Sequence, residues 1–277
     1  MIDKIRIWRT LRRNKTAIIG FILLFIVISV AIFAPLLSPD DPLEQNLSSR
    51  LAPPGKGHLL GTDNYGRDYF SRIIYGSRIS LLVGLLAVLL AMIVGSTAGM
   101  TAAFLGGVWE TIVMRAVDIM MSFPTLVMGL IVMVILGHGL INLIFGIAIV
   151  LAPRFARVAH GPTLSIKERD FISACEAIGM SKVRALTKHI LPNIFGEILV
   201  IGTLWMATAI RIEASLSFLG LGVSPPTPTW GNMIRTGIEY LNLPWLSAAP
   251  GLAVMVTALS FNMIGDGIRD ITDPKLW

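Results

Sequence analysis

The stretch ISLLVGLLAVLLAMIVGSTAGMTAAFL, residues 79–105, contains no Asp, Glu, Lys or Arg. An α-helix rises about 1.5 Å per residue, so about 20 apolar residues are enough to cross the hydrocarbon core of a bilayer. The stretch exceeds that length and predicts a transmembrane helix. The whole chain has the same character: 54% of its 277 residues are hydrophobic, 14% are charged, and the mean hydropathy is +0.74. We therefore expect an all-α polytopic membrane protein.

Five further apolar runs bring the expected number of transmembrane helices to six. The first run, at about 21 residues, is too long for the apolar part of a secretory signal, which is usually about 7 to 15 residues, so we interpret it as a retained helix. The uncharged stretch 119–153 is too long for one span, and GHG at 137–139 divides it. The expected spans are 17–37, 79–105, 117–136, 140–158, 198–219 and 246–264.

The Lys and Arg residues predict the orientation of the chain. Six crossings place both termini on one side of the membrane. About sixteen of the 23 Lys and Arg residues fall on that side and six on the other, leaving out Arg211. Because cytoplasmic loops carry the excess of these residues, we expect both termini in the cytoplasm. The net charge of +6 is explained by this pattern, and no nucleic-acid partner is expected.

The expected spans divide the chain into five parts. The residues between the first two spans are rich in Pro, Gly, Asp and Asn, which favour turns over regular elements. The expected parts are a cytoplasmic arm (1–16), a first transmembrane helix (17–38), an external loop (39–77), a five-helix core (78–266) with a long cytoplasmic loop at about 160–195, and a cytoplasmic tail (267–277).

No local pattern indicates catalysis or a bound cofactor. The turn PPGKGH at 53–58 lacks the upstream Gly and the Ser or Thr of a phosphate-binding loop. The four histidines lie in different loops without the spacing of a metal motif, and the single cysteine, Cys175, excludes a cysteine cluster. The thirteen methionines indicate packing more than a copper pathway. We expect no enzyme, no metal site and no cofactor held by this chain.

Four charged residues in or beside the expected spans are candidate pathway or inter-subunit contacts, because charge inside a membrane is costly. Arg115 and Asp118 are three residues apart at the cytoplasmic mouth of the third span and can pair on one helix face. Arg211 and Glu213 are two apart and point in different directions. Each then needs a partner from another helix or subunit, or lies solvated near the outer interface.

The stretch FISACEAIGMSKVRALTKHILPN, residues 171–193, interrupts the apolar chain on the cytoplasmic side. Its first eight residues carry small and apolar side chains at i, i+3, i+4 and i+7, which predicts one face of a short helix. This face consists of Phe171, Ala174, Cys175 and Ile178.

The end of this helix and the start of the next are also marked. Gly179 is typical of a helix C-terminus, and Ser181 is a favoured N-cap for a second segment at 182–190. Pro192 is expected to end that segment. Two short helices joined by small residues allow a partner surface to approach closely, so this pattern predicts a docking site.

The same stretch resembles the EAA loop of ABC-transporter permeases, whose pattern is E-A-A, three residues, G, nine residues, I-x-L-P. The residues that match are Ala174, Gly179, Leu191 and Pro192. Those that differ are Ser173 for Glu, Cys175 for the second Ala and His189 for Ile.

Four further segments resemble the dipeptide/oligopeptide/nickel permease family, in particular the second, C-type permease of the pair. They are LGTDNYGRDYFSRIIYGSRISLLVG (60–84), MRAVDIMMSFP (114–124), EASLSFLGLGVSPPTPTWGNM (213–233) and FNMIGDGIRDITDPKLW (261–277). The resemblance covers nearly the whole chain from Asn14 onward.

The resemblance implies a type I importer permease fold in the bacterial inner membrane, surrounded by lipid. It also implies a second homologous permease, two cytoplasmic ATPases that bind ATP and magnesium, and an external solute-binding protein. Residues 171–181 would form the coupling helix that fits a groove of the ATPase, and 222–232 would contact the binding protein, form the outer gate or cap the pore. The implied coupling residues are Phe171, Ser173, Ala174, Cys175, Ile178, Gly179, Leu191 and Pro192.

The expected function is that of a transmembrane permease subunit for peptides or related small solutes. The same machinery could import nickel or another metal complex, glutathione or an oligosaccharide. An ion-driven secondary carrier is the main alternative, and it requires transport by this chain alone and an essential carboxylate within a span. A membrane enzyme or assembly factor requires a reactive constellation that the sequence lacks.

Overall fold

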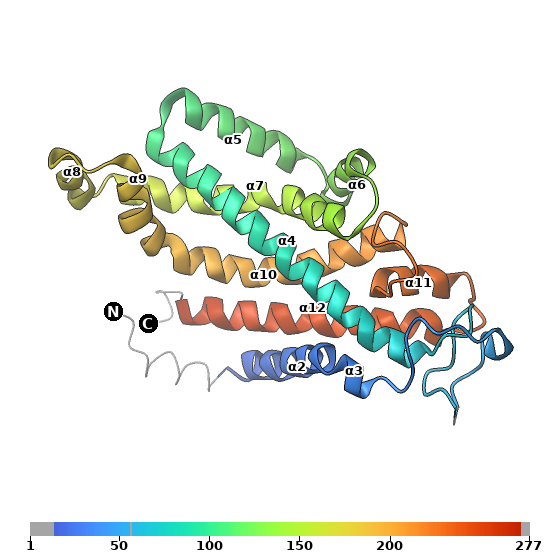
Figure 1. The fold of residues 1–277 in the computed structure, drawn as a ribbon. Coiled ribbons are helices and arrows are strands. Elements are labelled where there is room, and N and C mark those ends of the chain that lie inside the picture. Colours follow the sequence, from blue (N-terminus) through green and yellow to red (C-terminus); the bar gives the residue numbers. More distant parts are fainter. Residues whose placement is uncertain (1–13, 56, 273–277) are drawn as a thin grey trace.

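The computed structural model describes residues 14–55 and 57–272 (Figure 1). The predicted cytoplasmic arm falls almost wholly outside the described residues, as do residues 273–277 of the predicted tail. Within the described ranges there is no β-strand, only an isolated bridge between Thr62 and Asp68. The helices are α2 (Lys15–Ile32), α3 (Ala34–Leu37), α4 (Tyr69–Leu105), α5 (Gly107–Ser122), α6 (Thr125–Leu136), α7 (Leu140–Lys167), α8 (Asp170–Ala177), α9 (Lys182–Ala185), α10 (Leu191–Phe218), α11 (Trp230–Ile238) and α12 (Trp245–Thr272), with a 3-10 turn η1 (Leu47–Ser49) and a π-helical turn η2 (Leu186–Ile190).

Five continuous helical segments of the described chain are long and apolar enough to cross a membrane, and the pair α5 and α6 makes a sixth if it is counted as one span. This confirms the expected all-α polytopic fold. The five segments are Lys15–Ile32, Tyr69–Leu105, Leu140–Lys167, Lys182–Phe218 and Trp245–Arg269.

The third expected span, 117–136, is wrong as a single helix. The structure bends by 104° between α5 and α6. Phe123 adopts an extended conformation (φ −84°, ψ 141°) directly before Pro124. A proline ring disfavours helical geometry in the preceding residue, so the SFP sequence ends α5 and lets α6 leave in a new direction.

Helix α4 begins at Tyr69, well before the expected start of the second span at residue 79. Its N-cap is Asp68, whose side chain accepts a hydrogen bond from the Ser71 amide. This cap satisfies an amide that the first turn leaves without a helical partner, and the helix therefore extends into the predicted external loop.

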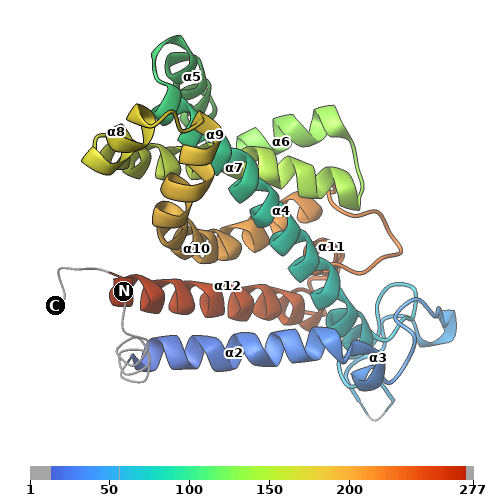
Figure 2. The same cartoon turned by 60° about the vertical axis from the view of Figure 1, so that its left-hand side comes forward.

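The helices form a bundle around α4. In both views α2 lies along α12 on one side, α5, α6 and α7 lie on the other, and α4 runs obliquely between them (Figures 1 and 2). The α4–α7 contact depends on small residues. A Cβ added at Gly95 would collide with the Ala152 carbonyl, and one at Gly99 with the Ala156 carbonyl. Two glycines four residues apart therefore let two backbones touch, the kind of packing that joins helices in membranes.

Replacement of Gly99 by Leu is expected to separate α4 from α7, because the new side chain would occupy the place of a backbone carbonyl. We expect a loss of more than about 2 kcal/mol in the unfolding free energy, the upper part of the range for overpacked cores. Thermal unfolding in detergent micelles measures it. Gly161→Leu in α7 is the matched control, because nothing lies within 4 Å of a Cβ built there. Equal unfolding temperatures for the two variants would contradict the proposed packing.

Candidate functional site

The interruption predicted at 171–193 lies at one end of the bundle. In Figure 1 helix α8 projects from the end opposite the loop that joins α3 to α4, and the described start of α2 and end of α12 lie at the same end as α8. This arrangement agrees with an even number of crossings. The cytoplasmic location of that end remains a prediction from the Lys and Arg distribution.

Helix α8 is attached to the bundle by a residue that the sequence pattern did not select. Ile172 is 1% exposed and belongs to the same buried cluster as Ile166 of α7 and Ile190 of η2. The predicted apolar face points outward instead, with Phe171 39% exposed and Ile178 79% exposed. The face is therefore available to something outside this chain.

Gly179 ends the helix as predicted. Its φ is +78°, the left-handed region, where a Cβ is strained. The Met180 amide donates to the Cys175 carbonyl at 3.0 Å, and the Ile178 amide donates to the Ala174 carbonyl at 3.2 Å. A bond that spans the left-handed residue in this way is the Schellman ending of a helix. It turns the chain sharply, and Gly179 itself stays exposed with open space around it.

Two residues that depart from the EAA pattern meet in space. The Sγ atom of Cys175 lies 3.9 Å from Nε2 of His189, and the Phe171 ring centroid lies 6.2 Å from that of His189. Sequence reasoning treated the departures at 175 and 189 separately. In the structure the two residues form one contact between α8 and η2. The two departures from the EAA pattern, Cys175 and His189, are therefore neighbours in space.

The second predicted helix, 182–190, differs from the structure at both ends. Ser181 stands at the N-cap position, but its side chain makes no capping hydrogen bond. The helix does not stop at Pro192: α9 passes through the π-helical turn η2 directly into α10. A proline ring clashes with the carbonyl four residues earlier in a regular helix, and a widened π turn relieves that clash. Leu191 and Pro192 thus belong to a continuous junction.

The charged candidates near the third span pair differently from the expectation. Asp118 of α5 pairs with Arg157 of α7, not with Arg115 of its own helix. Both paired side chains are about half exposed. The ion pair joins the two helices, but an exposed pair of this kind contributes little to stability.

The two charged residues of the fifth span separate sharply. Glu213 is fully buried, and its Oε1 accepts a hydrogen bond from the Ser217 hydroxyl at 2.8 Å. The Ser80 hydroxyl of α4 faces the same carboxyl group without hydrogen-bond geometry. Arg211 is exposed and donates to the Thr208 hydroxyl at 3.0 Å. Both hydrogen bonds stay within α10, while Ser80 brings a second helix to the Glu213 carboxyl. Glu213 is not solvated within this chain, and a partner from another subunit stays a prediction.

The outer segment at 222–232 is hydrogen-bonded to the bundle. Trp230, 2% exposed, donates from Nε1 to the Ile73 carbonyl at 3.1 Å, and the Asn232 amide donates to the Val223 carbonyl at 2.6 Å. The first bond holds the segment against the start of α4, and the second joins its two ends. This attachment favours the structural cap among the three expected roles, and all three stay predictions.

An ion network that sequence reasoning missed orders the loop before α4. The Asp63 carboxylate accepts from Nε of Arg67 at 2.7 Å and lies 3.3 Å from Nε of Arg72, and all three side chains are buried. Arg72 also donates to the Pro42 carbonyl at 2.8 Å. The available signal was the spacing of Asp63 and Arg67, four residues apart, but nothing local indicated that they are buried.

Five to six apolar spans and a protruding, sharply bent helix at one end of the bundle place the chain in the class of polytopic α-helical membrane proteins. The comparisons then define its family. The chain belongs to the binding-protein-dependent transport system inner membrane components, whose family model matches residues 95–277. Residues 5–54 match the N-terminal TM domain of oligopeptide transport permease C.

Relatives and a solved structure agree with this family. The chain is 43% identical over 270 residues to the dipeptide transport system permease protein DppC of Alkalihalophilus pseudofirmus, covering 97% of this chain and 89% of that protein. It is 41% identical over 276 residues to the protein of the same description from Escherichia coli, with 97% and 92% covered. An inward-facing structure of the MetNI methionine ABC transporter matches with a TM-score of 0.58 at 18% identity, covering 73% of this chain and 97% of that chain.

These findings confirm the expected family and type of permease. The protein is the permease component of an ABC importer, of the C type found in peptide transport systems, and a multi-pass inner-membrane protein. The likeness to the methionine transporter supports the fold alone. The relatives of this chain are membrane permease subunits, a class of component that is not itself an enzyme.

Ile172→Ala is expected to loosen α8 from the bundle, because burial of a large aliphatic side chain is lost and a cavity is left. A change of this type costs about 2 to 5 kcal/mol, so amide hydrogen exchange in 170–178 should accelerate more than tenfold. Ile178→Ala removes the same atoms from an exposed site and is the control. Similar exchange in the two variants would contradict the anchoring role of Ile172.

Proposed function

We propose that this chain forms half of the translocation pathway of an importer for peptides, together with a second homologous permease. An external solute-binding protein delivers the solute, and two cytoplasmic ATPases bind ATP and magnesium and supply the energy. This chain itself binds no nucleotide in the proposal. The observation that carries the proposal is the exposed apolar face of α8, which ends in a left-handed glycine at the predicted cytoplasmic end of the bundle.

The exposure of this face favours docking of a protein. Apolar side chains that lie beyond the spans and face water indicate an interaction surface when they cluster. Ile178 and Val183, 79% and 71% exposed, stand on the two sides of the Gly179 bend. Small residues at the bend allow a groove of the partner to close around it, and we assign that groove to the ATPase.

The attachment of α8 suggests how movement of an ATPase would reach the membrane. Ile172 is buried with residues of both α7 and η2, and η2 continues into α10 without a break. A pull on α8 would therefore act on two spans together instead of extending a flexible loop. Rigid-body rocking of such helices between inward and outward openings is a known form of alternating access.

Peptides are the proposed solute because the relatives are described as dipeptide and peptide transport permeases. No residue of the described chain is assigned to peptide recognition. Nickel or other metal complexes, glutathione and oligosaccharides remain the alternatives within the same machinery. A thermal-shift screen of the cognate solute-binding protein against peptides and metal chelates distinguishes among them.

Gly179→Trp is expected to reduce uptake more than tenfold, equivalent to the loss of about 1.4 kcal/mol of coupling, while the protein still inserts in the membrane. The indole would obstruct the bend, although nothing within this chain lies close to it. Uptake and ATP hydrolysis by the reconstituted complex are measured together, and hydrolysis should continue without transport.

Gly179→Asn is the matched control, because Asn tolerates the left-handed conformation and is small. It should transport at close to the wild-type rate. Normal uptake by Gly179→Trp in membranes with normal amounts of protein would refute the coupling role of this bend.

Glu213→Gln separates the importer from an ion-driven carrier. The amide keeps the size of the side chain and an oxygen that accepts from Ser217, so ATP-driven uptake should persist. A carrier that relies on a titrating carboxylate would instead lose ion-coupled uptake. The measurement is solute uptake by proteoliposomes with ATP or with an ion gradient. Uptake driven by the gradient in this chain alone, and abolished by Glu213→Gln, would establish the carrier and overturn the importer proposal.

A further inference from the structure

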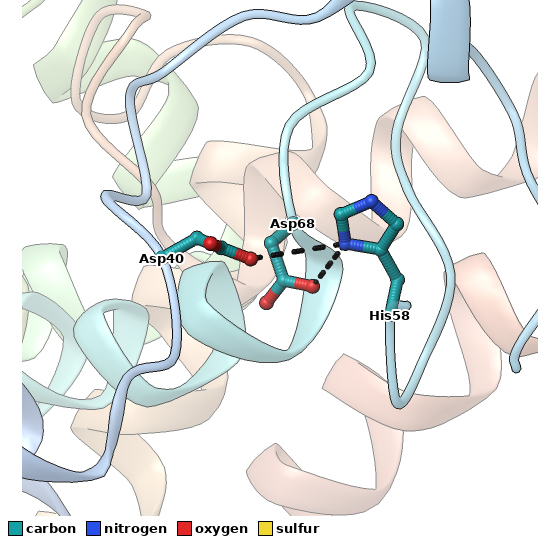
Figure 3. A group of neighbouring side chains, drawn as sticks. All are labelled: Asp40, His58 and Asp68. Carbon is teal, nitrogen blue, oxygen red and sulfur yellow. Dashed lines mark hydrogen bonds and ion pairs between the residues drawn. The ribbon is translucent and has the colours of Figure 1, made fainter. Parts of the chain in front are cut away.

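Three side chains converge in the external loop, which joins α3 to α4 at the end of the bundle opposite α8. Asp40, His58 and Asp68 come from the beginning, middle and end of the loop, and Figure 3 shows both carboxylates facing the same edge of the imidazole. Nδ1 of His58 lies 2.9 Å from Oδ1 of Asp68 and 3.8 Å from Oδ2 of Asp40. One ligand atom from each residue falls within 4.8 Å of the others.

These distances suit a metal ion. Zinc binds imidazole nitrogen and carboxylate oxygen at about 2.0 to 2.2 Å in tetrahedral geometry, which places neighbouring ligand atoms about 3.4 Å apart. The distances from His58 Nδ1 to Asp68 Oδ1, 2.9 Å, and to Asp40 Oδ2, 3.8 Å, lie on either side of that value. One nitrogen and two oxygens form a ligand set for a divalent first-row transition cation, with further positions for water on the exposed side of Asp40.

One serine contacts both acidic residues, through the carboxylate of Asp68 and the backbone of Asp40. Asp68 is 3% exposed, and its Oδ2 accepts from both the amide and the hydroxyl of Ser71 at 2.7 Å. The Ser71 hydroxyl oxygen in turn accepts from the Asp40 amide at 3.3 Å. Oδ1 of Asp68 is thus left facing His58. Hydrogen bonds that orient ligands from behind are a regular feature of metal sites.

The charge of the group also favours a cation. The buried guanidinium groups nearby, those of Arg67 and Arg72, are engaged by Asp63. In the described part of the chain, neither Asp40 nor Asp68 forms an ion pair with Lys or Arg. An imidazole that binds a metal through Nδ1 is neutral, so the two carboxylates beside it would carry two negative charges, one of them buried. The hydrogen bonds from Ser71 to Asp68 stabilise that charge but do not neutralise it. A divalent cation would balance both.

We propose that Asp40 Oδ2, His58 Nδ1 and Asp68 Oδ1 bind a divalent transition-metal cation, for which zinc is the probe. The site joins three segments of a loop that has no cysteine for a disulfide and whose described residues contain no helix except one short 3-10 turn. The energy of metal binding thereby adds to the stability of the loop. The inference does not depend on the solute or on the coupling role of α8.

The test is zinc titration of the purified permease complex, prepared with an affinity tag that contains no histidine. The wild type is expected to retain one more zinc ion per copy of this chain than Asp40→Asn or His58→Ala, with affinity reduced at least tenfold in the variants. Zinc should also slow amide hydrogen exchange at 38–68 in the wild type only. Asp40→Asn changes a half-exposed side chain, so folding is expected to be preserved.

His138→Ala is the matched control, because His138 is exposed and lies in the turn between α6 and α7, outside the group. It should bind zinc like the wild type. Equal zinc binding by the wild type, Asp40→Asn and His58→Ala would overturn the proposal and leave a hydrogen-bonded histidine–aspartate contact. Loss of zinc in His138→Ala together with retention in His58→Ala would assign the metal to another site and overturn it as well.

Discussion

Gly95 and Gly99 of α4 lie directly against the backbone carbonyls of Ala152 and Ala156 in α7, and much of the bundle is arranged around this contact. Lipid tails are as apolar as leucine, so apolar burial alone does not hold helices together in a bilayer. Close backbone packing supplies dispersion contacts that lipid cannot match. The α4–α7 pair is therefore the frame on which α10 and α5 are placed.

The frame connects the two ends of the molecule. Helix α4 starts inside the predicted external loop, where Asp68 caps it, and crosses the bundle beside α7. Helix α7 then continues past the expected end of its span and leads within a few residues to α8. A closely packed pair transmits displacement better than helices separated by long flexible side chains. A displacement at the end that carries α8 can therefore reach the opposite end of the bundle through this pair.

The sequence predicted much of this fold because the strongest signals are long or local. Apolar runs located the spans, and Gly179 located the end of α8, since a left-handed residue is needed there. The face of α8 that packs on the bundle was missed because Ile172 belongs to a buried cluster made mostly of residues distant in sequence. The prediction that Pro192 ends a helix was wrong, because the π-helical turn η2 accommodates the proline ring and the helix continues. Pro124 was available as a signal for the bend after α5, but the uncharged run around it favoured one continuous span.

The loop that joins α3 to α4 shows most clearly why local patterns fall short. Its sequence is turn-rich and was interpreted as a connection, yet Asp63 is buried between two arginines. A buried carboxylate is costly in isolation and becomes tolerable when cations pair with it, here Arg67 four residues further on and Arg72 in the first turn of α4. The same convergence brings Asp40 and Asp68 to His58. A histidine search based on spacing cannot find ligands that lie ten or more residues apart, because the fold, and not the local sequence, brings them together.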